Sequence, residues 1–350
     1  MRERKKTKIV KIGDVLIGGD NPIRIQSMTK TSTEDIEGTL NQIRRLKDLG
    51  CEIVRVAIPS EEAVLAFKEI KRNSPLPIVA DIHFNYRLAL KAIEYGADGI
   101  RINPGNIGSK ERVSEIVRLA KERGIPIRIG VNSGSLEKEL LKKYGSATTS
   151  ALVESVMNSV KLLEDFDFYD IKISVKASDI ERTVEAYRRI SELTDYPLHI
   201  GITEAGTLFS GTIKSSVGIG ILLYEGIGDT IRVSLSAPPE EEVRVGWEIL
   251  KVLGLRKKGI EIISCPTCGR LEVDLLPIVS EIERRTLSIE KNIKIAIMGC
   301  VVNGPGEAGE SDLALVCGKG VGLIYKKGKL LRKVKEEEMV EEFLREIQSY

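Results

Sequence analysis

The sequence predicts an α/β protein with a (β/α)8 TIM-type barrel, followed by a small α+β domain. From about residue 23 to 254, short β-branched segments alternate with longer segments whose apolar residues recur at helical spacing. Strands that alternate with helices pair in parallel through right-handed crossovers. Eight such strand segments match a closed barrel of roughly 250 residues. The alternation stops near residue 255, which indicates that a second domain begins there.

The predicted strands are rich in isoleucine and valine, as expected for parallel strands that are covered on both faces. Several of the intervening helical segments, such as 35–50 and 109–124, end at a glycine, which is a common helix stop. An open doubly wound sheet is the alternative fold. Such a sheet usually carries a glycine-rich phosphate turn after its first strand, and this chain has none there. The predicted strands are residues 23–28, 52–58, 77–83, 99–105, 126–132, 170–177, 197–205 and 230–237.

The segments that flank the barrel have patterns of their own. "TKIVKIGDVLIGGDNP", before the first strand, predicts a hairpin or lid over the barrel bottom. After "LGLRKKG", the strand and helix patterns predict an α+β domain of about 95 residues. We therefore expect a barrel domain at 1–254 and a small α+β domain at 255–350.

The composition is that of a globular protein, with 42% hydrophobic and 30% charged residues among 350. A formal net charge of +2 gives no electrostatic indication of nucleic acid or a membrane surface as a partner. The start, "MRERKKTKIV", lacks the apolar run of a signal peptide, and no stretch is long enough to span a bilayer. We therefore expect a cytoplasmic protein, in which a C-x-x-C motif indicates metal or redox chemistry before a disulfide.

Arginines interrupt four of the predicted strands. Arg55, Arg101, Arg128 and Arg232 lie in "VRV", "IRI", "IRI" and "IRV", and a buried arginine is unfavourable unless it meets an anion or a carboxylate. Because the strands of a barrel present their carboxyl ends at one mouth, these arginines would form a clamp for phosphate or diphosphate. Pairing with carboxylates of neighbouring strands is the alternative for each single arginine. Other polar residues at the predicted strand ends are Asp81, His83, Asn103, Asn106, Asn132, Lys172, Lys176, His199, Thr203, Glu204 and Ser234.

Three cysteines of the second domain lie in loops punctuated by glycine and proline. Cys265 and Cys268 share one tight turn, and Cys300 follows 32 residues later. A fourth ligand would be Cys317 or Glu307: strand alternation makes Cys317 a small buried residue, whereas Glu307 lies in a loop that continues from Cys300. Neither histidine belongs to this domain, so a structural zinc would need cysteines alone. Spacing by itself leaves both the fourth ligand and the choice between zinc and an iron–sulfur cluster open.

Several longer motifs identify a known family. The chain closely resembles the 4-hydroxy-3-methylbut-2-en-1-yl diphosphate synthases, the iron–sulfur enzymes of the non-mevalonate isoprenoid pathway. The resemblance covers essentially the whole chain and is to the two-domain bacterial form, and its most specific part is "GCVVNGPGEA". The other motifs that carry it are "CPTCGR", "DIHFNYRLAL", "IRINPGN", "RIGVNSGSL", "ITEAG" and "SSVGIGILLYEGIGDTIRVSLSA".

The resemblance implies a [4Fe–4S] cluster held by Cys265, Cys268, Cys300 and Glu307. It implies reductive ring opening and dehydration of 2-C-methyl-D-erythritol 2,4-cyclodiphosphate to 4-hydroxy-3-methylbut-2-enyl diphosphate. Two electrons would come one at a time from flavodoxin or ferredoxin. The family is also a head-to-tail homodimer, in which the cluster domain of one subunit caps the barrel of the other.

This chemistry agrees with the polar residues of the predicted strand ends. A cyclic diphosphate needs a cationic cradle with side chains that fix its orientation, and the departing hydroxyl needs a proton. Glu204 is the candidate general acid, and pairing with a clamp arginine is its alternative role. The cradle would be Arg55, Arg101, Arg128 and Lys176, the orienting residues Asn132 and Ser234, the residues that order the pocket Asp81 and His83, and the contact from the cluster side Asn303.

Two other functions remain compatible with the residues taken alone. One is a phosphate-binding barrel lyase or aldolase with a structural zinc, in which Lys172 or Lys176 forms a Schiff base. The other is a non-catalytic iron–sulfur carrier, although a carrier hardly needs a barrel with four inward arginines. The visible spectrum of anaerobically purified protein, with iron, sulfide and zinc analysis, separates these alternatives.

Overall fold

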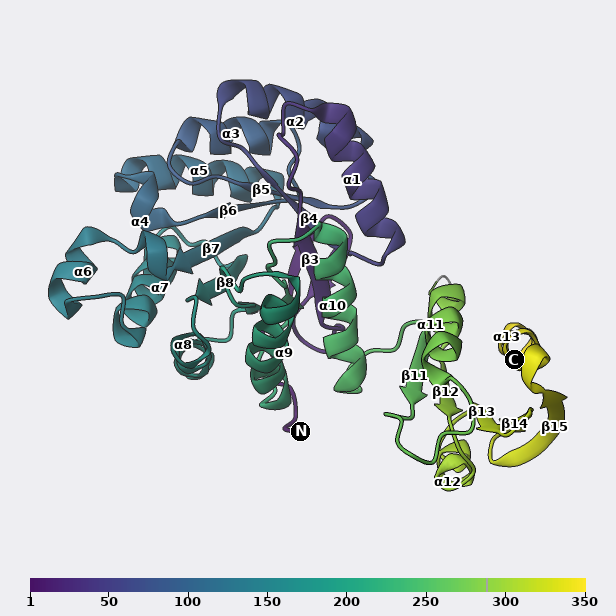
Figure 1. The fold of residues 1–350 in the computed structure, drawn as a ribbon. Helices are drawn as coiled ribbons and strands as arrows, with labels where there is room; N and C mark the ends of the chain where they lie inside the picture. The colour runs from purple at the N-terminus through teal and green to yellow at the C-terminus, as the bar shows by residue number, and fades with distance from the viewer. Residues whose placement is uncertain (288) are drawn as a thin grey trace. The chain divides into compact units, whose positions relative to one another are not determined.

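The computed structural model describes residues 1–287 and 289–350. The chain divides into two compact units, Met1–Arg256 and Lys257–Tyr350 (Figure 1). The sequence-based prediction placed this boundary two residues earlier, between 254 and 255. Each unit has its own sheet and its own hydrophobic core and is described by itself.

The first unit is a parallel barrel, as predicted. Its strands follow the hydrogen-bonded order β8-β7-β6-β5-β4-β3-β10-β9, and the bridge between Ile173 and Leu198 joins the β8 side to the chain just before β9. The eight strands are β3 Arg24–Met28, β4 Ile53–Ala57, β5 Ile78–Asp81, β6 Gly99–Ile102, β7 Ile127–Asn132, β8 Ile171–Lys176, β9 His199–Ile200 and β10 Thr230–Ile231 (Figure 1).

The last two barrel strands are much shorter than the segments 197–205 and 230–237 that the sequence predicted. The chain leaves β9 at Gly201, where an added Cβ would lie 2.2 Å from the carbonyl oxygen of Arg232. Glu204 and Gly206 then take left-handed φ values of +51° and +119°, which a strand does not contain. The apolar residues of these segments continue beyond the last hydrogen bonds of the sheet, because the loops that follow the strands are themselves partly buried. The sequence pattern therefore predicted longer strands.

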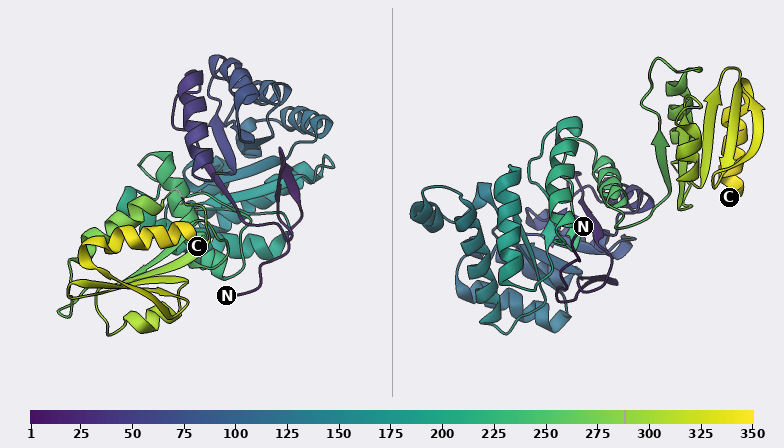
Figure 2. Two further views of the ribbon diagram at one scale, coloured as in Figure 1. Left: turned by 90° about the vertical axis from the view of Figure 1, so that its right-hand side faces the viewer. Right: turned by 90° about the horizontal axis from the view of Figure 1, so that it is seen from below.

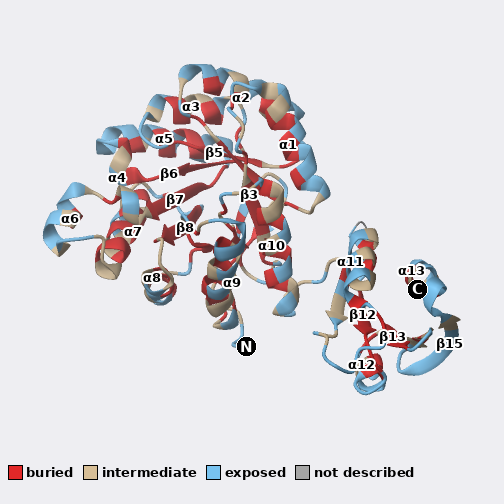
Figure 3. Cartoon of the chain, in the orientation of Figure 1, coloured by how far each residue is buried: buried red, intermediate tan, exposed pale blue. Residues whose placement is uncertain are grey.

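Helices follow the barrel strands and cover the outside of the sheet. Polar N-cap side chains begin several of them: Asp35 accepts from the amide of Gly38, and Ser60 accepts from that of Ala63. Figure 3 shows buried residues along the strands and on the helix faces that meet them. The helices are α1 Ile36–Asp48, α2 Glu61–Asn73, α3 Tyr86–Glu94, α4 Pro104–Ile107, α5 Lys110–Arg123, α6 Lys138–Tyr144, α7 Thr149–Glu164, α8 Ile180–Leu193, α9 Leu208–Tyr224 and α10 Pro239–Val252, with a 3-10 turn at Ser133–Ser135.

The hydrophobic core of this unit lies between the strands and the helices. Ile100 and Ile102 of β6 belong to that core, whereas Arg101 between them alternates to the other side of the sheet. The same alternation holds in β7, where Ile127 and Ile129 flank Arg128. The interior of the barrel is therefore lined by polar and charged side chains.

A hairpin packs at the amino-terminal ends of the strands. Its strands, β1 Val10–Ile12 and β2 Val15–Ile17, pair antiparallel. Ile12 and Ile17 form a small buried cluster with Ile53, the first residue of β4, and Val79 of β5. The hairpin thus covers the barrel bottom, as the sequence predicted, and leaves the carboxyl ends of the strands as the side available for ligands.

The second unit is a five-stranded mixed sheet in the order β11-β12-β13-β14-β15. The pairs β11–β12 and β12–β13 are parallel, and β13–β14 and β14–β15 are antiparallel. The elements are β11 Ile260–Ser264, α11 Leu275–Thr286, β12 Ile293–Met298, α12 Gly304–Gly309, β13 Leu313–Gly318, β14 Val321–Lys326, β15 Lys329–Lys335 and α13 Met339–Ser349, with a 3-10 turn at Glu336–Glu338.

The two faces of this sheet are covered to different extents. Residues from α11 and α13, including Ile282 and Phe343, pack on one face. On the other face, Ala308 of the short helix α12 packs with Ala314 and Val316 of β13. The left panel of Figure 2 shows this layering, with α13 and α12 on opposite sides of the sheet.

Within residues 1–287 and 289–350, no helix has both the length and the apolar composition needed to cross a bilayer.

Candidate active site

The strand register brings the predicted clamp residues together inside the barrel. Asp81 of β5 pairs with Arg101 of β6, Arg101 with Arg128 of β7, and Arg128 with Lys172 of β8. Because these residues lie at one level of four neighbouring strands, their side chains enter the barrel side by side. Arg101, Arg128 and Lys172 are each at most 4% exposed.

Asp81 is the carboxylate that partners the arginines on one side of the mouth. Its two oxygens lie 3.4 Å from Nε of Arg55 and 3.1 Å from Nη1 of Arg101. Burial alone would raise the pKa of Asp81, but Arg55, His83 and Arg101 hold it well below its usual value. Arg55 and Arg101 are thus partly accounted for by pairing with a carboxylate of a neighbouring strand. Because two arginines share one carboxylate, this group of three residues keeps a net positive charge.

Arg128 has no carboxylate partner among residues 1–287 and 289–350. Its Nη2 donates to Oγ of Ser174 at 3.1 Å, while its buried Nε and Nη1 have no partner among the described residues. Burial lowers the pKa of Arg128 well below the ordinary arginine value, and the neighbouring Arg55 and Arg101 lower it further. Unpaired donors inside a protein are costly, and this guanidinium has free donors that an anion could accept from.

Two lysines of β8 add to the positive charge. Lys172 is 3.4 Å from Oε1 of Gln26, and Lys176 pairs in register with Asn132 of β7. Burial, followed by repulsion from Arg128, lowers the pKa of both lysines well below the ordinary value. The barrel interior and mouth thus contain six basic side chains, Arg55, Arg101, Arg128, Lys172, Lys176 and Arg232, and three buried carboxylates, Asp81, Asp229 and Glu242.

The two histidines differ in their surroundings. His83 is half exposed at the mouth, and both ring nitrogens lie 3.2 Å from Nη1 of Arg101. His199 is fully buried, with Nδ1 2.7 Å from Oγ1 of Thr230. Burial lowers the pKa of His199 well below its usual value, so its imidazole is neutral. His199 is thus a hydrogen-bonded interior residue, whereas His83 can reach a ligand.

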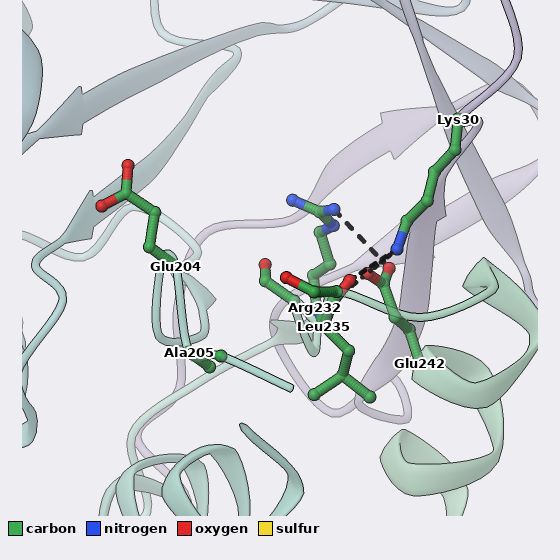
Figure 4. Close-up of a pocket in the computed structure, with 9 residues that line it drawn as sticks. Lys30, Glu204, Ala205, Arg232, Leu235 and Glu242 are labelled. Atoms are coloured by element: carbon green, nitrogen blue, oxygen red, sulfur yellow. Dashed lines mark hydrogen bonds and ion pairs between the residues drawn. The ribbon is translucent and has the colours of Figure 1, made fainter. Parts of the chain in front are cut away.

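A second cluster at the mouth contains a carboxylate that the sequence did not single out. Glu242, at the start of α10, lies 2.9 Å from Nζ of Lys30 and 3.5 Å from Nη2 of Arg232, and it accepts from the amide of Leu235 at 3.0 Å (Figure 4). Three glutamates begin α10, a charge pattern that the helix dipole alone explains. Burial distinguishes Glu242 from its two neighbours, and only the fold supplies it.

The same residues line a pocket with an empty volume of about 340 Å³. Ser234 and Glu204, both predicted site residues, also line it. Glu204 is exposed, projects away from the Lys30–Glu242–Arg232 cluster (Figure 4), and forms no ion pair with any residue that the structure describes. Its left-handed backbone is unusual for a glutamate and is a conformation often found at functional sites.

The cysteines of the second unit lie at one edge of its sheet. Cys265 follows β11 and Cys300 comes two residues after the end of β12, and these strands are parallel neighbours. The amide of Cys265 donates to the carbonyl of Ile297 at 3.0 Å, which continues the ladder to the cysteine. Cys268 lies on the loop that follows, where Thr267 has a left-handed φ of +66°. The carboxyl ends of two adjacent strands thus present the three thiols to the same side.

The surroundings of Cys300 favour its thiolate form. Hydrogen bonds from the amides of Val302 and Asn303, together with the nearby Arg270, lower the pKa of the thiol. Glu307, half-buried on α12, belongs to the same loop system, because its amide donates to the carbonyl of Asn303. Asn303 itself is exposed at the start of α12.

Cys317 has the opposite environment. It is fully buried on the α11 and α13 face of the sheet, 3.6 Å from the sulfur of Met339. Burial raises the pKa of its thiol to about 12. A fully buried cysteine on this face acts as a small core residue, and its protonated thiol is poorly suited to bind a metal centre.

The remaining donor set fits an iron–sulfur cluster in type and placement. The three thiols lie on loops at the carboxyl ends of β11 and β12, and one carboxylate lies on α12, just beyond the loop of Cys300. The Cys300 thiol is already biased toward thiolate, and the competing Cys317 is buried in the core on the α11 and α13 face. In the described part of the chain, no three His, Cys, Asp or Glu side chains are gathered closely enough to hold a metal ion.

Comparisons with known proteins agree along both units. Residues 7–247 match the model of the GcpE TIM-barrel domain, and residues 261–349 match that of the GcpE protein C-terminal domain. Curated relatives named 4-hydroxy-3-methylbut-2-en-1-yl diphosphate synthase (flavodoxin) include those of Caldanaerobacter subterraneus subsp. tengcongensis and Clostridium perfringens. The first is 60% identical, covering 99% of this chain and 98% of the relative, and the second is 58% identical, covering 99% of both.

Solved structures with low sequence identity share the barrel. 3-Dehydroquinate dehydratase from Geobacillus kaustophilus is 14% identical with a TM-score of 0.50, covering 70% of this chain and 97% of that chain. N-Acetylneuraminic acid synthetase from Leptospira borgpetersenii serovar Hardjo-bovis is 15% identical with a TM-score of 0.50, covering 80% and 97%. These likenesses show the fold alone.

Proposed function

The chain belongs to the GcpE family, and we propose that it converts 2-C-methyl-D-erythritol 2,4-cyclodiphosphate into 4-hydroxy-3-methylbut-2-enyl diphosphate. The family match confirms the resemblance inferred from the sequence motifs. In the reaction, the ring C–O bond and a C–OH bond break while a C=C bond forms. Two electrons and one proton are taken up, one water leaves, and the diphosphate gains one negative charge.

The barrel mouth binds the diphosphate in this proposal. Arg128, with two unpartnered buried nitrogens, and Lys176 are the central anion contacts, and Arg55 and Arg101 complete the cradle. Asp81 holds Arg55 and Arg101 in place through its two oxygens. The surplus of buried basic groups over carboxylates is the observation that carries the proposal, because an anionic ligand would stabilise these groups in their charged forms. In this arrangement His83, Asn132 and Ser234 fix the orientation of the ligand around the cradle.

The second unit would hold a [4Fe–4S] cluster through Cys265, Cys268, Cys300 and Glu307. When bound, the cluster would pass electrons to the substrate and supply an iron as a Lewis acid for a substrate oxygen. A carboxylate is a harder and more exchangeable ligand than a thiolate, which suits the position nearest the substrate. Asn303 would contact the substrate from the cluster side.

Glu204 would give the departing hydroxyl its proton. It lines a pocket at the barrel mouth together with Ser234 and Arg232, although its carboxyl group projects away from Arg232 (Figure 4). The role needs a proton on its carboxyl group, because a general acid donates its proton to the leaving group in the transition state.

The partners follow from the same reaction. The electron donor would be flavodoxin, which the names of the curated relatives specify, with ferredoxin as the alternative. A head-to-tail homodimer would bring the cluster domain of one subunit to the barrel of the other. The cytoplasmic location expected from the sequence stays a prediction.

An anaerobic preparation tests the proposal directly. We expect a brown protein with about four irons and four sulfides per chain, which converts the cyclic diphosphate with reduced flavodoxin. Arg101→Leu should raise KM for the cyclic diphosphate with little loss of cluster, whereas Arg123→Leu, the same change at an exposed end of α5, should not. A colourless protein without sulfide, or an unchanged KM for Arg101→Leu, would contradict the proposal.

A further inference from the structure

The second unit has a sheet face that its helices leave partly open. The helix α12 packs on β12 and β13 through Ala308, while Leu323 and Tyr325 of the next strand, β14, are only half-buried on that face. On the edge strand β15, Leu330 pairs with Tyr325 and Lys333 pairs with Leu323, so both point to the same side. Leu330 is 56% exposed. An apolar centre thus remains open beside α12.

Lysines surround this apolar centre. Residues 313–335 contain seven lysines and arginines and no aspartate or glutamate. Lys333 and Lys335 lie on the open face, since their register partners are Leu323 and Val321, and Lys327 lies in the turn before β15. All three are exposed, and none has a side-chain hydrogen bond or ion pair with a residue in the described part of the chain. We call the open face, made of Leu323, Tyr325, Leu330, Lys333 and Lys335 with the adjoining Lys327, the lysine face.

The lysine face is tied at both ends to the loops that carry the proposed cluster ligands. In the β14–β15 turn, an added Cβ at Gly328 would lie 3.3 Å from Cα of Gly309, two residues after Glu307. In the β13–β14 turn, the amide of Lys319 donates to Glu272 at 2.9 Å, and the amide of Glu272 donates to the carbonyl of Gly299 at 3.4 Å. Gly299 directly precedes Cys300. A protein bound on this face would therefore sit beside the cluster site.

We propose that the lysine face is the docking surface for an acidic electron-carrier protein, which delivers single electrons to the cluster. The inference rests on the proposed function, because it needs a cluster held by Cys300 and Glu307. A small apolar centre with unpaired charges around it is typical of transient electron-transfer contacts, in which opposite charges steer the encounter. Each encounter oxidises the carrier by one electron, and two encounters complete one turnover.

Lysines on an edge strand also prevent strand pairing between copies of a protein. That role needs only the charge on β15. It does not need the lysine of the preceding turn, and it does not explain an exposed leucine in the centre of the face. The two roles also differ in what they predict for donors of different size, because a small reductant needs no docking surface.

The experiment compares two donors with the holoenzyme of each variant. Lys333→Glu/Lys335→Glu should lower kcat/KM for flavodoxin hydroquinone by on the order of tenfold or more at low salt, and raising the ionic strength should narrow the difference from wild type. With reduced methyl viologen as donor, turnover should be unchanged. The control Lys138→Glu/Lys142→Glu makes the same charge change on exposed positions of α6 and should leave both rates unchanged.

Further outcomes separate docking from other roles. Lys327→Glu and Leu330→Ser change the turn and the apolar centre, and each should slow the flavodoxin reaction alone; they decide the matter if the double variant does not fold. Flavodoxin kinetics equal to wild type in these variants would overturn the proposal, as would self-association of the β15 variant without any kinetic change. Failure of the wild-type enzyme with both donors would instead contradict the proposed function.

Discussion

Replacing Arg128 should stabilise the unliganded protein and weaken substrate binding at the same time. The guanidinium is 4% exposed, makes one side-chain hydrogen bond, to Ser174, and has two further nitrogens without a partner in the described chain. In the variant Arg128→Met, an apolar side chain of similar length takes the place of this buried cation. Repulsion from Arg55 and Arg101 is also removed.

The substitution should therefore increase the stability of the unliganded protein and decrease its affinity for substrate. Replacing buried charges by apolar residues is often neutral or stabilising by about 1–4 kcal/mol. At about 2–4 °C per kcal/mol for a domain of this size, the melting temperature should rise by several degrees. Removing one partner of a desolvated charge pair costs about 2–5 kcal/mol of binding. Since about 1.4 kcal/mol is a factor of ten, affinity should fall from about 30-fold to a few thousand-fold.

Thermal unfolding of anaerobic protein, with and without the cyclic diphosphate, measures both effects. Arg128→Met should melt higher than wild type without substrate and should gain much less stability when substrate is added. Arg123→Met, at an exposed helix end, should change neither quantity. A lower melting temperature together with an undiminished substrate shift would mean that Arg128 is a structural residue, and the clamp argument would fail.

Three further predictions concern other parts of the site. Glu307→Ala should keep the fold but lose the cluster and turnover, whereas Cys317→Ala should keep the cluster and turnover. Equal iron and sulfide contents in the two variants would contradict the assignment of Glu307 as a cluster ligand. Glu242→Gln should lower the free energy of unfolding by about 1–3 kcal/mol, because it leaves Arg232 unpaired and Lys30, which is one-third exposed, less well paired. It should also raise KM for the cyclic diphosphate. A melting temperature and a KM equal to those of the wild type would refute this prediction. The unfolded chain binds more protons than the folded one wherever pH lies between the lowered pKa values of Lys172 and Lys176 and the ordinary value of about 10.4. The free energy of unfolding without substrate should therefore rise with pH in that window, while the extra stability gained on adding substrate should fall. If melting experiments with and without substrate gave the same pH dependence, this prediction would be wrong.

The barrel itself could be predicted because its signal is local and repeated. Each strand and each helix can be recognised from the spacing of its own apolar residues, and a chain of eight alternating strand–helix units can adopt only a few topologies. The ends of β9 and β10 were predicted too long, because sheet hydrogen bonding stops where Gly201 meets the carbonyl of Arg232, and these residues are distant in sequence.

Some residues of the candidate site could likewise be predicted from local sequence, and others could not. Arg55, Arg101 and Arg128 stand out in sequence because a charge inside an apolar strand is locally unusual. Glu242 and Lys30 do not, because a glutamate at a helix start and a lysine in a loop are ordinary. Their ion pair forms from residues more than two hundred positions apart.

The sequence by itself determined the fold class and the family, and it predicted the domain boundary and a set of candidate residues for binding a diphosphate and a cluster. Only the tertiary structure decided which of these charges are paired. Asp81 partly neutralises Arg55 and Arg101, and Arg128 has no carboxylate partner among the described residues. The thiol of Cys317 is buried in the core on the α11 and α13 face. The physical reason is that pairing and burial depend on distances across the barrel and across the second sheet, which local patterns along the chain do not contain.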